Sequence, residues 1–360
     1  MDRKIFLEKI SCTAKALRGS GELNILVKSG EMEVSAASEH LAVSNRFPVD
    51  CKDMSIAVKA STMMAIIGKI PEDEISLILN GETVLVKWKT GKASLPVFEF
   101  REVMRQCGDG TVHPVHHLTQ YVGQVVHSLD NTGYNPLMST VHIQLLRDGG
   151  FQLTALDGKR YSIRQVGKGK PSGEYVVYGV EFYDALKLMG DQEIHILEPE
   201  GGNFIQLSTD GMTIQVSLFG KPYFNLDALR SRKLPVRVMV DKLELSKAVD
   251  LVKQVSKKAF LDFTADRVTI AGATSSGESI MKIPAVSKGL DEERVIRTAF
   301  NVTFLSEALD SIDSERVVIH MKDALSQFCI TDGRYAIEMV LPARRESAEI
   351  ENHTVIKAAG

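Results

Sequence analysis

The sequence repeats one pattern three times, with a period of about 120 residues. Each copy reads as a helix, a group of strands, a second helix and a second group of strands. The second helices are predicted to begin near Lys59, Gly179 and Asn301, which are 120 and 122 residues apart. Matched strand positions, spaced by 119 and 116 residues, are Ser35, Thr154 and Ile270. Because two independent landmarks agree, the chain is predicted to consist of three similar domains.

Within each copy, helical periodicity alternates with strand periodicity. The helix predicted over residues 2–18 has an apolar face of Phe6, Ile10, Ala14 and Leu17. The stretch VHHLTQYVGQVVHSLD is predicted to form the corresponding helix of the second copy. The strand runs alternate apolar and polar residues and turn at signals such as the Asn-Gly pair at 80–81, which favours antiparallel hairpins. These patterns predict an α+β fold in which each domain packs two helices on antiparallel sheets.

The domain boundaries are expected at two stretches rich in turn formers or proline, CGDGTVHP and SRKLPV. They divide the chain into domains at 1–112, 113–235 and 236–345. Residues 346–360 are expected to form a flexible tail. A further hypothesis is that the stretch EIENHTVI in this tail lies over a neighbouring pocket and competes with partners.

Composition limits the compartment and the kind of partner. No apolar run is long enough to span a membrane, and the first residues form an amphipathic segment with acidic side chains, so a cytoplasmic protein is expected. The four cysteines show no CxxC spacing and are expected to be free thiols. A net charge of −3 excludes a strongly basic nucleic-acid footprint. Any contact with DNA must therefore rely on local charge.

The stretch Asp157-Gly158-Lys159-Arg160 raises the possibility of an enzyme that handles nucleotides through Asp157 and Lys159. No second carboxylate has a spacing that would converge with Asp157, and no phosphate-binding glycine loop is present. His113 and His117 have helical spacing but no third ligand, so neither a metal nor a cofactor is expected. Asp-Gly is instead typical of a hairpin turn, and the protein is interpreted as having no catalytic residues.

Four stretches, in this order and spacing, resemble the bacterial sliding clamp, the beta subunit of DNA polymerase III. They are VKASTMMAIIGKIPEDEISLILNGETVLVKWKTGKASLPVFEF, SLDNTGYNPLMSTVHIQLLRDGGFQLTALDGKRYSI, VMVDKLELSKAVDLVKQVS and the closing MVLPAR. The resemblance covers residues 1–345 and implies the DNA clamp fold in a head-to-tail homodimeric ring around double-stranded DNA. It implies a processivity factor that tethers the replicative polymerase and is loaded by a clamp loader. An alternative is a clamp-like scaffold paralogue that binds partner peptides without encircling DNA.

The resemblance also implies a partner-peptide pocket between the second and third domains. By matched position, the pocket would contain Met138, Leu156, Gly158, Lys159, Arg160, Tyr161, Pro222, Leu229, Leu325, Val340, Leu341, Pro342, Ala343 and Arg344. Such an apolar groove with a few cations suits a peptide with one Gln and two bulky apolar anchors. This chain departs from the family at Lys159, Tyr161 and Pro222. Arg160 is expected to be a cation at the rim that contributes little to stability.

The resemblance places further residues beside DNA and in the dimer contact. The candidate DNA-binding residues are Lys4, Lys15, Arg18, Lys87, Lys89, Lys92, Lys247 and Lys257. The loop KWKTGKAS is a stronger candidate than any helix, because the helix faces mix charges or can be ordinary solvated surfaces. The dimer contact is expected to join the region of Phe100 to residues 255–260 of the partner, including Val255 and Phe260.

Overall fold

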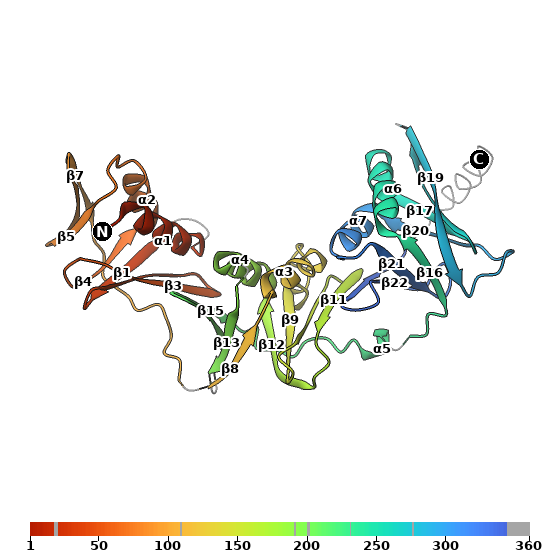
Figure 1. Ribbon diagram of the computed structural model, residues 1–360, viewed down its shortest axis with the longest axis horizontal. Helices are drawn as coiled ribbons and strands as arrows, with labels where there is room; N and C mark the ends of the chain where they lie inside the picture. The colour runs from red at the N-terminus through yellow and green to blue at the C-terminus, as the bar shows by residue number, and fades with distance from the viewer. Residues whose placement is uncertain are drawn as a thin grey trace. The chain divides into compact units, whose positions relative to one another are not determined.

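The computed structural model describes residues 1–17, 21–108, 110–190, 192–199, 202–230, 232–275 and 277–343. The chain folds into two compact units, each assembled from two separate segments (Figure 1). The first unit combines Met1–Gln120 with Val177–Gly220, and the second combines Tyr121–Val176 with Lys221–Gly360. Since both units take part of the predicted middle domain, the predicted domain boundaries stay a prediction.

The first unit contains an eight-stranded antiparallel sheet and a smaller three-stranded one. The order in the large sheet is β4 (Met54–Lys59), β1 (Glu22–Lys28), β2 (Glu31–Ala37), β3 (Leu41–Pro48), β15 (Met212–Ser217), β14 (Phe204–Thr209), β13 (Ile194–Pro199) and β8 (Gly110–Val115). The small sheet is β5 (Ser76–Asn80), β6 (Thr83–Trp88) and β7 (Gly91–Pro96). The pair β3–β15 joins two distant parts of the chain, and we call it the first seam.

Helices α1 (Arg3–Lys15) and α2 (Ala60–Ile67) lie side by side and pack on the strands of this unit (Figure 1). Asp2 caps α1 by accepting a hydrogen bond from the Ile5 amide at 2.9 Å. Phe6 and Ile10 are fully buried in the core beneath, where each side chain contributes about 1.5–3 kcal/mol of hydrophobic free energy. The helical periodicity predicted for this segment is confirmed. Helix α4 (Gly179–Met189) belongs to the same unit.

The second unit is built on a twelve-stranded antiparallel sheet. Its order is β12 (Pro171–Tyr178), β9 (Thr140–Leu146), β10 (Phe151–Leu156), β11 (Arg160–Val166), β23 (Ala336–Val340), β22 (Phe328–Thr331), β21 (Arg316–Met321), β16 (Val236–Asp241), β19 (Gly277–Lys288), β18 (Arg267–Thr274), β17 (Lys258–Phe263) and β20 (Ile296–Asn301). Here the pair β11–β23 joins distant parts of the chain, and we call it the second seam.

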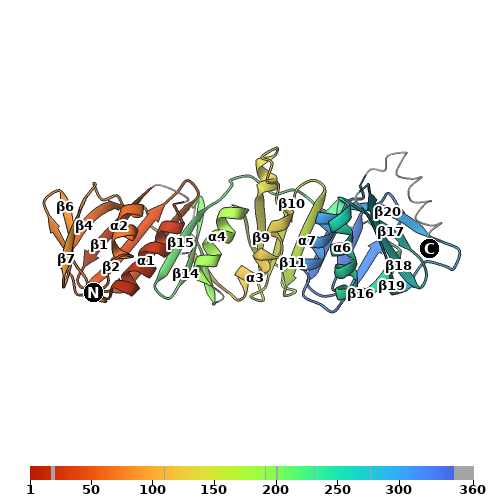
Figure 2. The ribbon, with the colours of Figure 1, turned by 90° about the horizontal axis from the view of Figure 1, so that it is seen from above.

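Helices α6 (Lys242–Val255) and α7 (Val302–Asp310) lie side by side on this unit (Figure 2). Asp241 and Asn301 cap them by accepting hydrogen bonds from the Glu244 and Thr303 amides, both at 2.9 Å. Their apolar faces bury Leu245, Val249, Val252, Leu305 and Leu309 in one core with the strands. The unit also contains a short helix α5 (Asp227–Arg230) and the 3-10 helices η1 (Val126–Ser128) and η2 (Pro136–Ser139).

The second helices of the three copies begin where the repeat predicts, because Lys59 caps α2, Gly179 opens α4 and Asn301 caps α7. The α+β class with antiparallel sheets is confirmed. The helix expected at VHHLTQYVGQVVHSLD is shorter than expected, since α3 spans only Leu118–Gly123 before η1 follows. Glycine and β-branched valines disfavour helix, and this stretch carries Gly123 followed by a Val-Val pair at 125–126. Among the described residues, no helix could cross a membrane.

Candidate functional site

The Asp-Gly stretch at 157–158 forms the hairpin turn between β10 and β11. The Asp157 Oδ1 atom accepts hydrogen bonds from the amides of Lys159 at 2.8 Å and Arg160 at 2.9 Å. Gly158 has a φ of +83°, which favours glycine. Asp332 makes the same kind of turn by accepting from the amides of Arg334 and Tyr335. The structural role predicted for Asp157 is confirmed.

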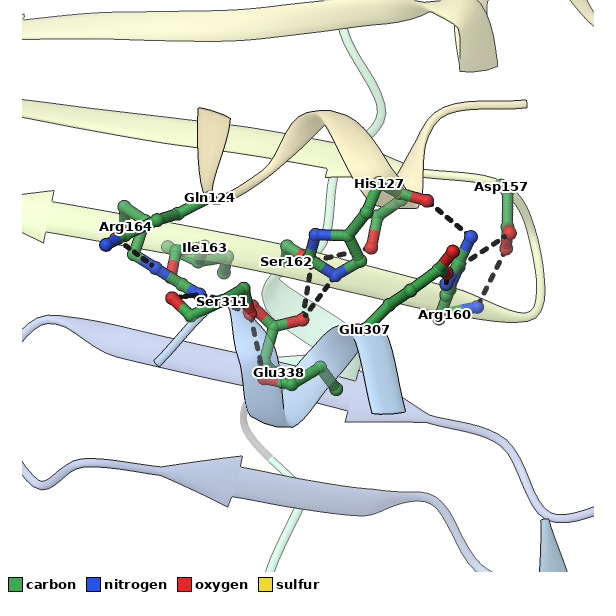
Figure 3. Close-up of polar contacts among 12 residues, drawn as sticks. Gln124, His127, Asp157, Arg160, Ser162, Ile163, Arg164, Glu307, Ser311 and Glu338 are labelled. Atoms are coloured by element: carbon green, nitrogen blue, oxygen red, sulfur yellow. Dashed lines mark hydrogen bonds and ion pairs between the residues drawn. The ribbon is translucent and has the colours of Figure 1, made fainter. Parts of the chain in front are cut away.

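Arg160 does not lie at a rim as expected, because its side chain is buried, with the residue 7% exposed. Its Nε donates to Asp157 Oδ2 at 3.0 Å, and its two terminal nitrogens donate to Glu307 on α7 and to the His127 carbonyl oxygen (Figure 3). The guanidinium also stacks on the Phe304 ring, with the Cζ atom 4.2 Å from the ring centroid. Arg160 therefore ties the turn to α7 and η1.

A second buried arginine, Arg164, forms an ion pair across the second seam (Figure 3). Arg164 Nη2 lies 2.6 Å from Glu338 Oε1, and both side chains are 1% exposed. Arg164 also donates to Gln124 Oε1 at 3.0 Å and to the carbonyl and hydroxyl oxygens of Ser311, each at 2.8 Å. The guanidinium is thus surrounded by acceptors, as a buried charge requires.

Both carboxylate oxygens of Glu338 also have polar partners other than Arg164. Its Oε2 accepts from Ser162 Oγ at 2.6 Å and lies 3.2 Å from His127 Nε2 (Figure 3). Its Oε1 accepts from Ser311 Oγ at 3.1 Å. We call Gln124, His127, Ser162, Arg164, Ser311 and Glu338 the seam network. Sequence reasoning missed it, although Glu338 is the one charged residue in the strand AIEMV.

An apolar cluster lies next to the turn. Its buried members are Leu156, Tyr161, Ile163, Cys329 and Met339, and its half-buried members are Met138, Tyr223, Phe224, Leu226, Leu234 and Ile337. The Tyr161 hydroxyl hydrogen-bonds the Cys329 thiol, and burial raises the pKa of Tyr161 well above its ordinary value and that of Cys329 to about 11. Both groups are therefore protonated at neutral pH and add no charge to the apolar cluster.

The structure brings some predicted pocket residues together and separates others. Met138, Leu156 and Tyr161 belong to the apolar cluster, and Gly158 lies beside Met138. The Leu341 amide donates to the Lys159 carbonyl at 2.9 Å, which places this exposed leucine beside the turn.

The remaining predicted pocket residues that the structure describes lie outside the apolar cluster and differ in exposure. Lys159, Pro222 and Leu325 are exposed, and Pro342 and Ala343 are half-buried. Val340 is buried in the core beneath α6 and α7 rather than in the apolar cluster. The Leu229 side chain, all of Arg344 and the tail over 346–360 lie outside the described residues. The pocket as a whole stays a prediction.

A cavity of about 250 Å³ adjoins the apolar cluster. It is lined by His142, Gln144, Gln152, Thr154, Ile163, Glu174, Tyr223, Phe224, Asn225, Leu226, Asp227 and Arg230. Four of these residues, Ile163, Tyr223, Phe224 and Leu226, also belong to the apolar cluster. The apolar cluster and the cavity are therefore continuous. The cavity and its polar lining were not predicted from the sequence.

The predicted DNA-binding lysines are all exposed where the structure describes them: Lys4, Lys15, Lys87, Lys89, Lys92, Lys247 and Lys257. Arg18 lies outside the described residues. Lys4 pairs with Asp73 at 3.1 Å. Lys87 and Lys92 are directly opposite each other on β6 and β7, where like charges repel. No ion pair with a described residue offsets this repulsion. The assignment of these lysines to DNA binding stays a prediction.

The predicted dimer residues differ in exposure. Phe100 and Val255 are half-buried, whereas Phe260 is 8% exposed within its own unit. These three positions stay predictions. Trp88 packs against Gly91 and the core of the first unit.

Comparison with known proteins gives a consistent result. No family model matches the sequence. The beta sliding clamp of Halalkalibacterium halodurans is 22% identical over an alignment of 402 positions, which covers 96% of this chain and 98% of that protein. The DNA polymerase III subunit beta of Pseudomonas aeruginosa superposes with a TM-score of 0.86 at 16% identity, covering 96% of this chain and 99% of that one. The sliding clamp of Bacillus subtilis superposes with a TM-score of 0.87 at 14% identity, covering 96% and 98%. This chain therefore has the fold of the bacterial sliding clamp, the beta subunit of DNA polymerase III, and resembles it in sequence along nearly its whole length.

Proposed function

We propose that this chain is a DNA sliding clamp, the processivity factor of a replicative DNA polymerase. The observation that carries the proposal is the match of the whole fold, which spans 98–99% of known clamp chains rather than one shared domain. In this proposal two copies form a head-to-tail ring around duplex DNA and supply no catalytic residues. A ring holds DNA by its topology, so its affinity need not come from many salt-sensitive phosphate contacts. The net charge of −3 is compatible with such a role.

The ring is tested by retention on DNA. With its host's clamp loader and ATP, the protein should stay on nicked circular duplex through gel filtration and be lost when the circle is linearised. Equal retention on circular and linear DNA would contradict encirclement. Failure to be retained on either, together with binding of partner peptides, would favour the scaffold alternative.

The basic hairpin supplies the matched variant for this experiment. Lys87→Gln combined with Lys92→Gln should preserve retention on circles, because topology does not depend on these side chains. Direct binding to a short duplex should lose about two units of slope in log affinity against log salt concentration. Thermal stability should not fall, since the substitutions remove a cross-strand repulsion.

We further propose that partners bind beside the turn at 157–160 through a short peptide. The supporting observation is the group of uncharged side chains of Tyr161, Cys329 and Met339 in the apolar cluster. This group lies next to Leu341 and Lys159, which are both exposed. An apolar surface with one cation at its edge suits an apolar anchor followed by a carboxylate or a polar group.

Leu341→Ala is expected to weaken a labelled Gln-Ala-Ala-Leu-Phe peptide by about 5- to 150-fold, because truncating an anchor contact costs about 1–3 kcal/mol. Fluorescence anisotropy measures the change. Val286→Ala removes an exposed apolar side chain from β19 and should leave the affinity unchanged. Equal binding by the wild type and Leu341→Ala would remove the site from this surface.

A further inference from the structure

The two seams have the same strand register, so positions in one can be matched with positions in the other. In the first seam, Ala42 pairs with both Ala37 and Gln215. In the second seam, Tyr161 pairs with both Leu156 and Met339. Met339 therefore occupies the place of Gln215.

The same register extends one strand further. Ser35 pairs with Asn24, and its repeat counterpart Thr154 pairs with His142. His142 therefore occupies the place of Asn24. At these two matched backbone positions the first seam has amide side chains, Asn24 and Gln215. The second seam has an imidazole, His142, and a thioether, Met339.

A connecting segment crosses the first seam and is fastened there by those two amides. We call residues 97–108 the first connector. Asn24 Oδ1 accepts from the Arg101 amide at 2.9 Å. The Gln215 side chain accepts from the Arg105 amide and donates to the Arg105 carbonyl, both at 2.8 Å. The Arg105 side chain adds hydrogen bonds to Asn203 and Ser217. An extended main chain is thus held across the seam.

The matched segment of the second unit lacks this fastening. We call residues 221–235 the second connector. In its described part both main-chain hydrogen bonds are internal, from Asp227 to the Asn225 side chain and from Arg230 to the Leu226 carbonyl. The segment is held by apolar packing and by the Tyr223 ring, which stacks on the His142 ring with centroids 4.8 Å apart.

The cavity of about 250 Å³ lies under the second connector. Its lining includes Asp227 and Arg230, which carry opposite charges, and its other polar groups suit an uncharged side chain. The Tyr223 hydroxyl is buried and has no hydrogen-bond partner among the described residues. Burial raises its pKa, so it remains a neutral donor and acceptor. Gln152 donates to Gln144 at 2.9 Å, which leaves further amide groups for a ligand. Glu174 already bonds His142 at 2.8 Å.

We propose that the second connector is a movable cover that lifts to admit an extended partner segment beneath it, so that an uncharged polar side chain of that segment enters this cavity beside the Tyr223 hydroxyl. The occupant is inferred from the first connector, which shows that the matched seam holds an extended chain. The inference rests on the proposed peptide-binding function. The described part of the connector can lift with most of its apolar packing kept, because its main chain makes no hydrogen bond to the sheet that would have to break. Occupation of the cavity would satisfy the Tyr223 hydroxyl, which is costly to leave unpaired.

Hydrogen exchange measured by mass spectrometry on the free protein tests the cover. Amides over residues 223–230 should exchange about 10-fold or more faster than those of Arg101 and Arg105. His142→Asn should slow exchange at Tyr223, and the reciprocal Asn24→His should speed exchange at Arg101. Equal protection of the two connectors in the wild type would overturn the proposal.

Tyr223→Phe tests the cavity, because it removes the unpaired hydroxyl and retains the ring. Affinity for Gln-Ala-Ala-Leu-Phe should fall about 5-fold. Affinity for Ala-Ala-Ala-Leu-Phe and the melting temperature should stay unchanged. Equal loss for both peptides, or none for either, would overturn the assignment of the cavity. If the wild type binds neither peptide, the proposed peptide function fails, whereas the exchange experiment still decides whether the connector is a cover.

Discussion

Replacing Glu338 by alanine is expected to lower the free energy of unfolding by about 3–5 kcal/mol, because it leaves the Arg164 guanidinium buried without its counter-charge. The Ser162 and Ser311 hydroxyls also lose their carboxylate acceptor. Urea denaturation followed by circular dichroism measures the loss. Glu278→Ala, at an exposed glutamate of β19, is the control and should change stability by less than about 0.5 kcal/mol.

A double variant separates the buried charge from the packing. Arg164→Met combined with Glu338→Leu removes both charges and should be less destabilised than Glu338→Ala alone. If Glu338→Ala costs under about 1 kcal/mol, the seam network does not hold the β11–β23 pair in the way its geometry indicates.

Replacing Arg160 by alanine is expected to cost about 2–4 kcal/mol of stability, because it breaks hydrogen bonds to Asp157, Glu307 and the His127 carbonyl in a largely buried site. Glu307 keeps more than a third of its side chain exposed, which places the expected loss below that of a fully buried pair. Arg160→Lys should not restore stability, since an ammonium cannot reproduce the planar fork of a guanidinium.

The neighbouring Lys159 provides the matched control. It carries the same charge one residue away but is exposed, so Lys159→Ala should change the melting temperature little. Differential scanning calorimetry compares the two variants. Equal melting temperatures for Arg160→Ala and Lys159→Ala would show that the buried contacts of Arg160 add nothing. Peptide affinity of Arg160→Ala must be measured where the variant is fully folded, because the same substitution disturbs the turn.

The repeat predicted the fold well because local patterns carry it. Helix starts at Lys59, Gly179 and Asn301 follow from periodicity and capping, which depend on neighbouring residues. The Asp157 turn was predictable for the same reason. The helix predicted at VHHLTQYVGQVVHSLD is shorter in the structure. Its apolar pattern continues past Gly123, but glycine and the valines that follow have a low helix propensity.

The site was less predictable because its contacts join distant parts of the chain. Arg160 reads as a surface cation in the sequence, and only the fold brings Glu307, 147 residues later, to its guanidinium. Glu338 meets Ser162 across 176 residues. The second seam has His142 and Met339 at the positions that match Asn24 and Gln215 of the first seam. This difference beside the second connector can be recognised only from the strand registers and not from sequence spacing.

The first seam has a consequence for synthesis on the ribosome. In it, Val43 of β3 pairs with Ile214 of β15, 171 residues later. At about 5–20 residues per second, the β3 edge therefore waits roughly 10–30 s for its partner strand after it has been made. An unpaired strand edge is a template for pairing with another chain. Nascent copies translated from one message are thus exposed to mutual strand exchange for about half of the time needed to make the 360 residues, until Ser217 has emerged.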